Sequence, residues 1–371
     1  MSKLKITNKL TFEPTIFRDW SMVTVNIAWQ MFTKEFKKQF NWQYTDALCV
    51  WDGKKVTFYM AREEYIYGLF NFLIRKIKKD KNFIEKICKS LLSQMSKYTL
   101  FTNKILETNF DNLRDQSLLN LFNLFVNKNI ALGPKFLITR YFPQNLERYP
   151  ELLKKYKKQY NLTIRTREKI DRILAPISEK IIFKFTKYFL KKIGAPISLA
   201  RFSTIEEVNM LATPNDKKLV KKIISELKRR KKYFLFAGGK ISYIAPSSYL
   251  KNKNWKLVKN QNKDEIKGYV AYRGKKNLIR GVVRVIENKT EFSKLKKNEI
   301  IVAPMTNPEY AVIIKKTKAI ITNEGGVTCH AAIISRELKI PCIIGAKNAT
   351  QILRDNDLIE MDINKGMVKK L

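Results

Sequence analysis

One stretch of the chain, residues 319–338, constrains the fold more than any other. It begins with an apolar run at residues 319–322, passes through Gly325 and Gly326, and ends in an apolar segment with helical spacing. This order predicts a strand, a glycine turn and a helix. Further short strands are expected on both sides of it, so residues 268–371 are predicted to form a compact α/β domain.

The predicted helix carries His330 in its first turn, and this is the one histidine among 371 residues. A helix N-terminus presents unpaired backbone amides and the positive end of the helix dipole, which together stabilise a phosphate dianion. A neutral imidazole placed there can attack phosphorus and then hold the phosphoryl group, because the ring has a lone pair near pH 7. Gly325 and Gly326 allow the backbone to approach without a side-chain clash.

Composition excludes most other kinds of site. A Ser-His-Asp triad, a Cys-His pair or a multi-histidine metal site can exist only if it uses His330. The four cysteines, Cys49, Cys88, Cys329 and Cys342, include no CxxC pair, which argues against a zinc ribbon, a redox dithiol or a disulfide scaffold. No apolar run reaches the roughly 18 to 20 residues of a spanning helix, and no signal-type apolar core follows Met1. We therefore expect a cytoplasmic protein without a metal site.

The charge of the chain is strongly positive, with 73 lysines and arginines, 33 aspartates and glutamates, and a net charge of +40. This excess makes nucleic acid or an acidic partner an alternative to be weighed. It is spread along the chain, however, and residues 268–371 carry +9 of it. The densest basic run, residues 228–232, is expected at the C-terminal end of a helix, where cations suit the helix dipole. Compositional bias is the simpler interpretation.

Residues 1–200 are predicted to form a mostly helical domain that begins with a small β-hairpin. Apolar segments at residues 47–51 and 56–60 flank Asp52-Gly53, a typical hairpin turn. From about residue 61 onward, apolar residues recur at spacings of three and four, which predicts several packed helices. We expect an α+β arrangement dominated by helices in this part of the chain.

The next segments are predicted to connect the two domains. Residues 201–245 are expected to be a helical connector, and residues 246–267 a polar linker that contains Pro246-Ser247-Ser248. Four of the thirteen glycines lie in the first 237 residues, at Gly53, Gly68, Gly133 and Gly194. Phosphate-cradling loops usually use clustered glycines, so no nucleotide loop is expected there.

The motif at residues 325–338, Gly-Gly-x-Thr-Cys-His-Ala-Ala-Ile-Ile-Ser-Arg-Glu-Leu, resembles the phosphohistidine motif of phosphoenolpyruvate-utilising enzymes. The segments at residues 304–308 and 355–357 also resemble the mobile, swivelling domain of that family, as found in phosphoenolpyruvate synthase and pyruvate phosphate dikinase. A weaker likeness at residues 202–233 matches the helical segment that often precedes this domain.

The resemblance implies a role for each residue of the motif. His330 is the phosphoacceptor and carrier, Thr328 contacts the phosphoryl group or orients the ring, and the backbone of Gly325, Gly326 and Cys329 lines the phosphate. From the sequence alone Thr328 can equally be the N-cap of the helix, a role that needs no chemistry. The family's carrier moves between two distant active sites. The resemblance implies no tightly bound cofactor on this domain. ATP or phosphoenolpyruvate is the phosphoryl donor, and a partner protein supplies it together with Mg²⁺.

Two departures from the family pattern bear on the expectations. Lys339 stands where the family usually has glycine after the helix, a position that favours positive φ, so a slightly strained or rearranged turn is expected. The ATP-grasp domain and the phosphoenolpyruvate-binding barrel of the full enzymes are not recognised in the sequence.

Three functional hypotheses follow. The first is a phosphohistidine carrier subunit or reduced phosphotransferase that depends on a separate nucleotide- or phosphoenolpyruvate-binding protein. The second is a non-catalytic binding module whose basic surface takes nucleic acid or an acidic partner. The third is a self-contained kinase that binds nucleotide in its N-terminal part.

Overall fold

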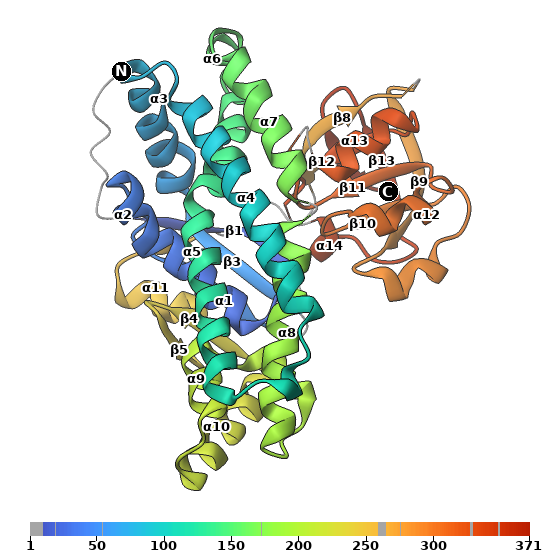
Figure 1. The fold of residues 1–371 in the computed structure, drawn as a ribbon. Helices are drawn as coiled ribbons and strands as arrows, with labels where there is room; N and C mark the ends of the chain where they lie inside the picture. The colour runs from blue at the N-terminus through green and yellow to red at the C-terminus, as the bar shows by residue number, and fades with distance from the viewer. Residues whose placement is uncertain are drawn as a thin grey trace. The chain divides into compact units, whose positions relative to one another are not determined.

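The computed structural model describes most of the chain, namely residues 10–18, 20–53, 55–171, 173–258, 265–274, 276–326, 329–347 and 349–371. Two compact units are present (Figure 1). The N-terminal unit comprises Met1–Glu13 with Arg18–Leu257, and the C-terminal unit comprises Pro14–Phe17 with Val258–Leu371.

The N-terminal unit is mostly helical, as the apolar spacing predicts. In α3, for example, the side chains of Leu69, Phe72 and Leu73 are buried while lysines occupy its last turn. The helical elements, among which η1 and η2 are π-helices and η3 and η4 are 3₁₀-helices, are α1 (Met22–Gln30), η1 (Met31–Glu35), α2 (Phe36–Phe40), η2 (Glu63–Gly68), α3 (Leu69–Lys79), α4 (Phe83–Glu107), η3 (Phe110–Asn112), α5 (Asp115–Leu146), α6 (Pro150–Lys155), α7 (Lys157–Asp171), α8 (Leu174–Lys192), η4 (Ile197–Phe202), α9 (Ile205–Ala212), α10 (Lys217–Arg230) and α11 (Pro246–Asn252).

The predicted hairpin lies in the middle of a larger sheet. Strands β2 (Ala47–Trp51) and β3 (Val56–Ala61) pair antiparallel, with Ala47 opposite Met60. The full sheet has the order β5-β4-β2-β3-β1-β6. Its other strands are β1 (Thr11–Arg18), β4 (Phe234–Ala237), β5 (Lys240–Ser242) and β6 (Lys256–Leu257).

Most of the connector and linker predicted at residues 201–245 and 246–267 belongs to the N-terminal unit, which extends to Leu257. Strand β4 is buried throughout and pairs with β2, a partner almost 200 residues earlier in the chain. Residues 246–252 form α11, whose Leu250 is buried in the core of the same unit. Local sequence patterns do not show such long-range pairing, so the sequence misplaced this boundary. Part of the predicted linker, residues 259–264, lies outside the described residues.

The buried carboxylate of Asp46 links α11 and the β4–β5 turn, which come late in the chain, to α1, which comes early. It accepts hydrogen bonds from Trp29 Nε1 at 2.9 Å, from the Tyr249 hydroxyl at 2.8 Å and from the Gly238 backbone N–H at 3.1 Å. The three donors come from α1, α11 and the β4–β5 turn. A buried carboxylate that is fully engaged in this way orders all the segments that donate to it.

The C-terminal unit is an α/β domain, as predicted, and it is built on a sheet of order β7-β14-β13-β9-β10-β11-β12-β8. Strands β9 to β12 are parallel to one another, while β13, β14 and β7 on one side and β8 on the other are antiparallel to their neighbours. The strands are β7 (Glu265–Lys267), β8 (Tyr269–Tyr272), β9 (Leu278–Val285), β10 (Ile300–Ala303), β11 (Ala319–Thr322), β12 (Cys342–Ile344), β13 (Leu358–Asp362) and β14 (Met367–Lys370). The helical elements are η5 (Lys289–Lys294), η6 (Pro308–Tyr310), α12 (Ala311–Ile314), α13 (His330–Glu337) and α14 (Ala349–Ile352).

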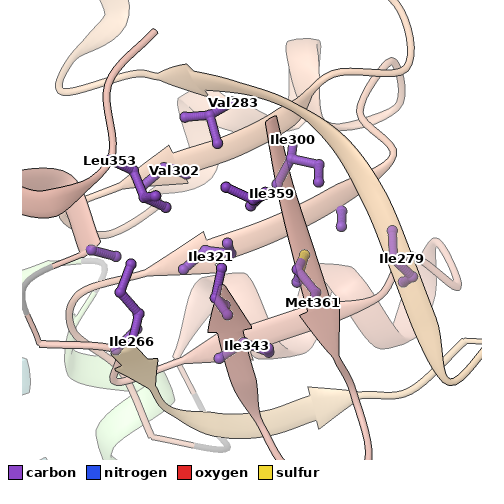
Figure 2. Packing of buried hydrophobic residues seen from close by; sticks show 14 of the residues in the cluster. Ile266, Ile279, Val283, Ile300, Val302, Ile321, Ile343, Leu353, Ile359 and Met361 are labelled. Atoms are coloured by element: carbon purple, nitrogen blue, oxygen red, sulfur yellow. The ribbon is translucent and has the colours of Figure 1, made fainter. Parts of the chain in front are cut away.

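The central parallel strands are buried on both faces, which explains their continuous apolar sequences. Ile300 and Val302 of β10 pack with Ile359 and Met361 of β13 in one cluster (Figure 2). The alternate residues of β10 and β11 face a second cluster that contains Ala331 and Ala332 of α13. The small alanines let α13 pack closely on the sheet, and this places the start of the helix at its edge.

We predict that replacing Asp46 by alanine destabilises the N-terminal unit by about 2 to 4 kcal/mol, because several partly buried donors lose their charged acceptor together. Urea denaturation followed by tryptophan fluorescence measures the change. Asp111→Ala, at an exposed position, is the matched control and is expected to change stability by less than about 0.5 kcal/mol. An Asp46→Ala midpoint equal to that of the wild type would contradict this account of the unit.

The turn after α13 gives a second prediction. Lys339 has φ of +56°, so the left-handed conformation persists although a lysine occupies the position. Lys339→Gly is expected to stabilise the C-terminal unit by about 1 kcal/mol, because glycine adopts positive φ without the steric cost of a Cβ atom. Thermal unfolding is the measurement, and Lys369→Gly, within strand β14, is expected to destabilise instead. Destabilisation by both changes would argue against strain at Lys339.

Candidate active site

Helix α13 begins at His330, with Cys329 as its N-cap residue in an extended conformation. The Cys329 carbonyl accepts the first helical hydrogen bond from the Ile333 N–H at 3.0 Å. No acidic residue lies in the first turn. His330 therefore stands in the first turn of a helix, as the sequence predicted, at the end that carries the unpaired amides and the positive end of the helix dipole.

Two loops at the carboxyl ends of neighbouring parallel strands lie beside this helix start. Ala303 of β10 is in register with Thr322 of β11, so the loops that follow both strands leave the sheet at the same edge. They are hydrogen-bonded to each other, since the Asn323 and Glu324 N–H groups donate to the carbonyls of Ala303 and Pro304, each at 3.0 Å. Ligands in α/β sheets bind at this edge because the loops converge there.

The loop after β10 brings Thr306 to the histidine. The Thr306 hydroxyl and His330 Nδ1 lie 2.9 Å apart and share a hydrogen bond. Thr306 is buried and His330 is half-buried, so one side of the ring is anchored within the protein. When the hydroxyl accepts from Nδ1–H, the lone pair of the neutral ring lies on Nε2. The arrangement then orients a nucleophilic nitrogen at the start of a helix.

The loop after β11 contains the predicted glycines. Gly325 has φ of +134°, and a Cβ atom there would lie 2.6 Å from Cys329 Sγ. A side chain at this position would therefore displace the residue that caps α13. Gly326 accepts a hydrogen bond from the Cys329 N–H at 2.9 Å. Gly325, Gly326 and Cys329 therefore lie close together just before α13, whose first residue, His330, contacts Thr306.

The expected phosphate contacts of this loop are only partly consistent with the structure. The Cys329 backbone amide, predicted to bind phosphate, is already used in its hydrogen bond to Gly326, so Cys329 serves instead as the N-cap. Thr328 lies outside the described residues, and its predicted contact with the phosphoryl group stays a prediction. The amides of Gly325 and Gly326 keep their predicted role as a proposal.

Buried polar residues hold the β11 loop in place. The Asn323 side chain donates to the Thr350 hydroxyl at 2.7 Å and accepts from the Thr350 N–H at 2.9 Å. The Thr322 hydroxyl donates to the Glu324 carbonyl at 2.6 Å. Sequence reasoning missed both Asn323 and Thr306 as site residues. Both residues could have been found from one sequence feature, a polar side chain within a few residues of the carboxyl end of a predicted buried strand.

Thiolate chemistry is not favoured at Cys342, which lies in the apolar cluster that packs on α13. Cys342 is fully buried, and burial raises the pKa of its thiol, so it stays protonated near neutral pH. Cys329 and Cys342 pack in the same apolar cluster as α13. Over the described ranges of the chain, no group of three or more histidine, cysteine, aspartate or glutamate residues is arranged to hold a metal ion.

Comparison with known proteins identifies this region. Residues 295–366 match the mobile domain of PEP-utilising enzymes. The matched segment contains Thr306, both glycines, Cys329 and His330. The rest of the chain is not part of that match.

Curated relatives match the same part of the chain. A probable phosphoenolpyruvate synthase of Methanothermobacter thermautotrophicus is 45% identical over 103 residues, which are 28% of this chain and 15% of that protein. One from Archaeoglobus fulgidus is 38% identical over 136 residues, 35% of this chain and 18% of that protein. The phosphoenolpyruvate synthase of Pyrococcus furiosus is 46% identical over 90 residues, 24% of this chain and 11% of that protein. The chain therefore spans less than a fifth of the length of these relatives.

Solved structures add little to this comparison. An alignment with the NMR structure of an Enzyme I protein covers 79% of this chain and 79% of the Enzyme I chain, at 14% sequence identity. Its TM-score of 0.21 is too low to carry an argument about the fold. Within the residues that the structure describes, no helix is long and apolar enough to cross a membrane.

We predict that Thr306 selects the tautomer of His330. Because the chain has one histidine, ¹⁵N-histidine labelling gives a spectrum of this ring alone. The wild type is expected to carry its neutral-ring proton on Nδ1, whereas Thr306→Val, which removes the hydroxyl, is expected to populate both tautomers. Thr306→Ser keeps the hydroxyl and is the matched control. Identical ring spectra for wild type and Thr306→Val would remove Thr306 from the site.

Proposed function

We propose that the protein transfers phosphoryl groups through a phosphohistidine at His330, as a carrier subunit or reduced phosphotransferase. The observation that carries the proposal is the hydrogen bond between Thr306 and His330 Nδ1 at the N-terminus of α13. It combines an oriented imidazole with a helix end that suits a phosphate. The match of residues 295–366 to the PEP-utilising mobile domain supports the same chemistry.

In the proposed reaction, Nε2 attacks the phosphorus atom of the donor. The N–P bond forms as the donor's P–O bond breaks, and the leaving oxygen takes that electron pair. The Nδ1 proton remains on the ring, held by the Thr306 hydroxyl, and the imidazole gains positive charge as the bond forms. The first-turn amides of α13 and the backbone at Gly325 and Gly326 stabilise the transferred phosphoryl group. Transfer to an acceptor reverses these bond changes.

A separate protein is proposed to bind the donor, ATP or phosphoenolpyruvate, together with Mg²⁺. Phosphoryl transfer depends on positioning and charge neutralisation of the donor. The first 237 residues have no clustered glycines of the kind that cradle phosphates. We propose that the N-terminal unit docks the donor protein or an acceptor.

The experiment is to incubate the protein with cell extract and, in turn, β-labelled ATP, γ-labelled ATP and labelled phosphoenolpyruvate. One of the three labels is expected to reach the protein as an acid-labile, base-stable phosphate. His330→Ala should lose the label completely, because the nucleophile is absent. A second variant, His330→Gln, keeps a side chain of similar length without a nucleophilic nitrogen and should also lose the label. Thermal unfolding of both variants checks that the C-terminal unit is intact.

Each outcome of this experiment separates the hypotheses. Labelling that survives His330→Ala would overturn the proposal. Labelling by ATP alone, with no extract, would replace the carrier with a self-contained kinase. The position of the label that transfers, β or γ, identifies which bond of the nucleotide is broken.

A further inference from the structure

The exposed face of helix α10 carries an unusually dense array of cations. The helix lies at the lower end of the N-terminal unit in Figure 1 and contacts α9 and η4. Its buried residues are Ile223, Leu227 and Arg230. The exposed cations, which we call the α10 basic face, are Lys217, Lys218, Lys221, Lys222, Lys228 and Arg229, followed by Lys231 and Lys232 directly after the helix.

The six cations within the helix gather on one side of it. At about 100° per residue they fall within roughly 140° of the helix circumference, and Ser225 is the uncharged residue between them. The one acid of the helix, Glu226, lies at the edge of this sector. Its carboxylate accepts from the Tyr243 hydroxyl at 2.7 Å and lies 3.9 Å from the Arg229 guanidinium. No carboxylate of the helix therefore interrupts the basic face.

Helix stability does not account for this arrangement. Lys217 and Lys218 occupy the first turn, which contains no acidic residue. Cations at that end oppose the helix dipole. The pairs Lys217–Lys221 and Lys218–Lys222 also place like charges four residues apart, which destabilises a helix. A favourable interaction of cations with the C-terminal end of the helix dipole explains the basic residues at 228–232 but not those at the start of the helix.

We infer that the α10 basic face binds the phosphate backbone of a nucleic-acid duplex. A membrane surface is disfavoured, because the apolar side of α10 packs on the unit and offers little area that could enter lipid. Ile223 and Leu227 are buried, and Leu219 is the exposed apolar residue of the helix.

Single strands are usually held by aromatic side chains that stack on bases. Residues 217–232 contain no aromatic residue, and the ring of the neighbouring Tyr243 is already stacked against the Arg229 guanidinium, 3.6 Å from the ring centroid. Lysines on flexible stems along one straight helix instead suit regularly spaced phosphates, without sequence preference.

The size of the face sets the expected footprint. The helix has 14 residues and is about 21 Å long. This length matches about six base pairs of duplex at 3.4 Å each. The binding does not depend on phosphotransfer, so it is independent of His330.

The test is fluorescence anisotropy with a labelled 20-base-pair DNA duplex of mixed sequence over a series of salt concentrations. In the test variant, Lys218, Lys221, Lys222 and Lys228 become glutamine, which has a helix propensity close to that of lysine. The matched control carries four Lys→Gln changes at other exposed positions of the same unit, Lys78, Lys79, Lys81 and Lys97. Circular dichroism confirms that both variants are folded.

We expect the test variant to bind the duplex at least about tenfold more weakly, with a slope of log K against log salt that is shallower by about 3. The control and His330→Ala should bind like the wild type. Equal losses in test and control variants would show that the charge acts globally and would overturn the inference. Binding of polyglutamate or of phosphatidylglycerol vesicles, with no binding of the duplex, would also overturn it.

Discussion

Parallel pairing of β10 with β11 is the constraint on which the candidate site depends. Because the two strands run in the same direction and in register, Thr306 and the loop of Gly325 and Gly326 leave the sheet at one edge. The hydrogen bonds of Asn323 and Glu324 then join the two loops. The contact between Thr306 and His330 follows from this pairing, since the two residues are 24 positions apart in the chain.

The sheet can impose this geometry because it is buried on both faces. One face packs on Ala349 and Leu353, in and next to α14, and the other face packs on α13. A shift of register would disrupt close packing on both faces. Ala331 and Ala332 bring α13 close to the strands, and the helix N-terminus is thereby held at the carboxyl edge. The position of His330 therefore depends on packing several residues away from the ring.

Local features were predictable from the sequence and distant partners were not. The strand, glycine turn and helix around His330, and the hairpin of β2 and β3, follow from apolar runs and glycine positions. Thr306 was missed because its role depends on a strand pairing, although it lies in a recognisable motif. The connector and linker were misplaced for the same reason, since β4 pairs with β2 and Tyr249 reaches Asp46 only in the folded chain. The basic run at residues 228–232 was visible in the sequence, whereas its continuity with Lys217, Lys218, Lys221 and Lys222 on one face follows from the helix α10 that the structure shows.

His330 is proposed to accept a phosphoryl group on Nε2. The most direct measurement is NMR of ¹⁵N-histidine-labelled protein after phosphorylation, in which coupling between phosphorus and one ring nitrogen identifies the bond. We expect coupling to Nε2, with the Nδ1 proton retained in the hydrogen bond to Thr306. Phosphorus on Nδ1, or a phosphorylated protein whose histidine spectrum is unchanged, would contradict the proposal.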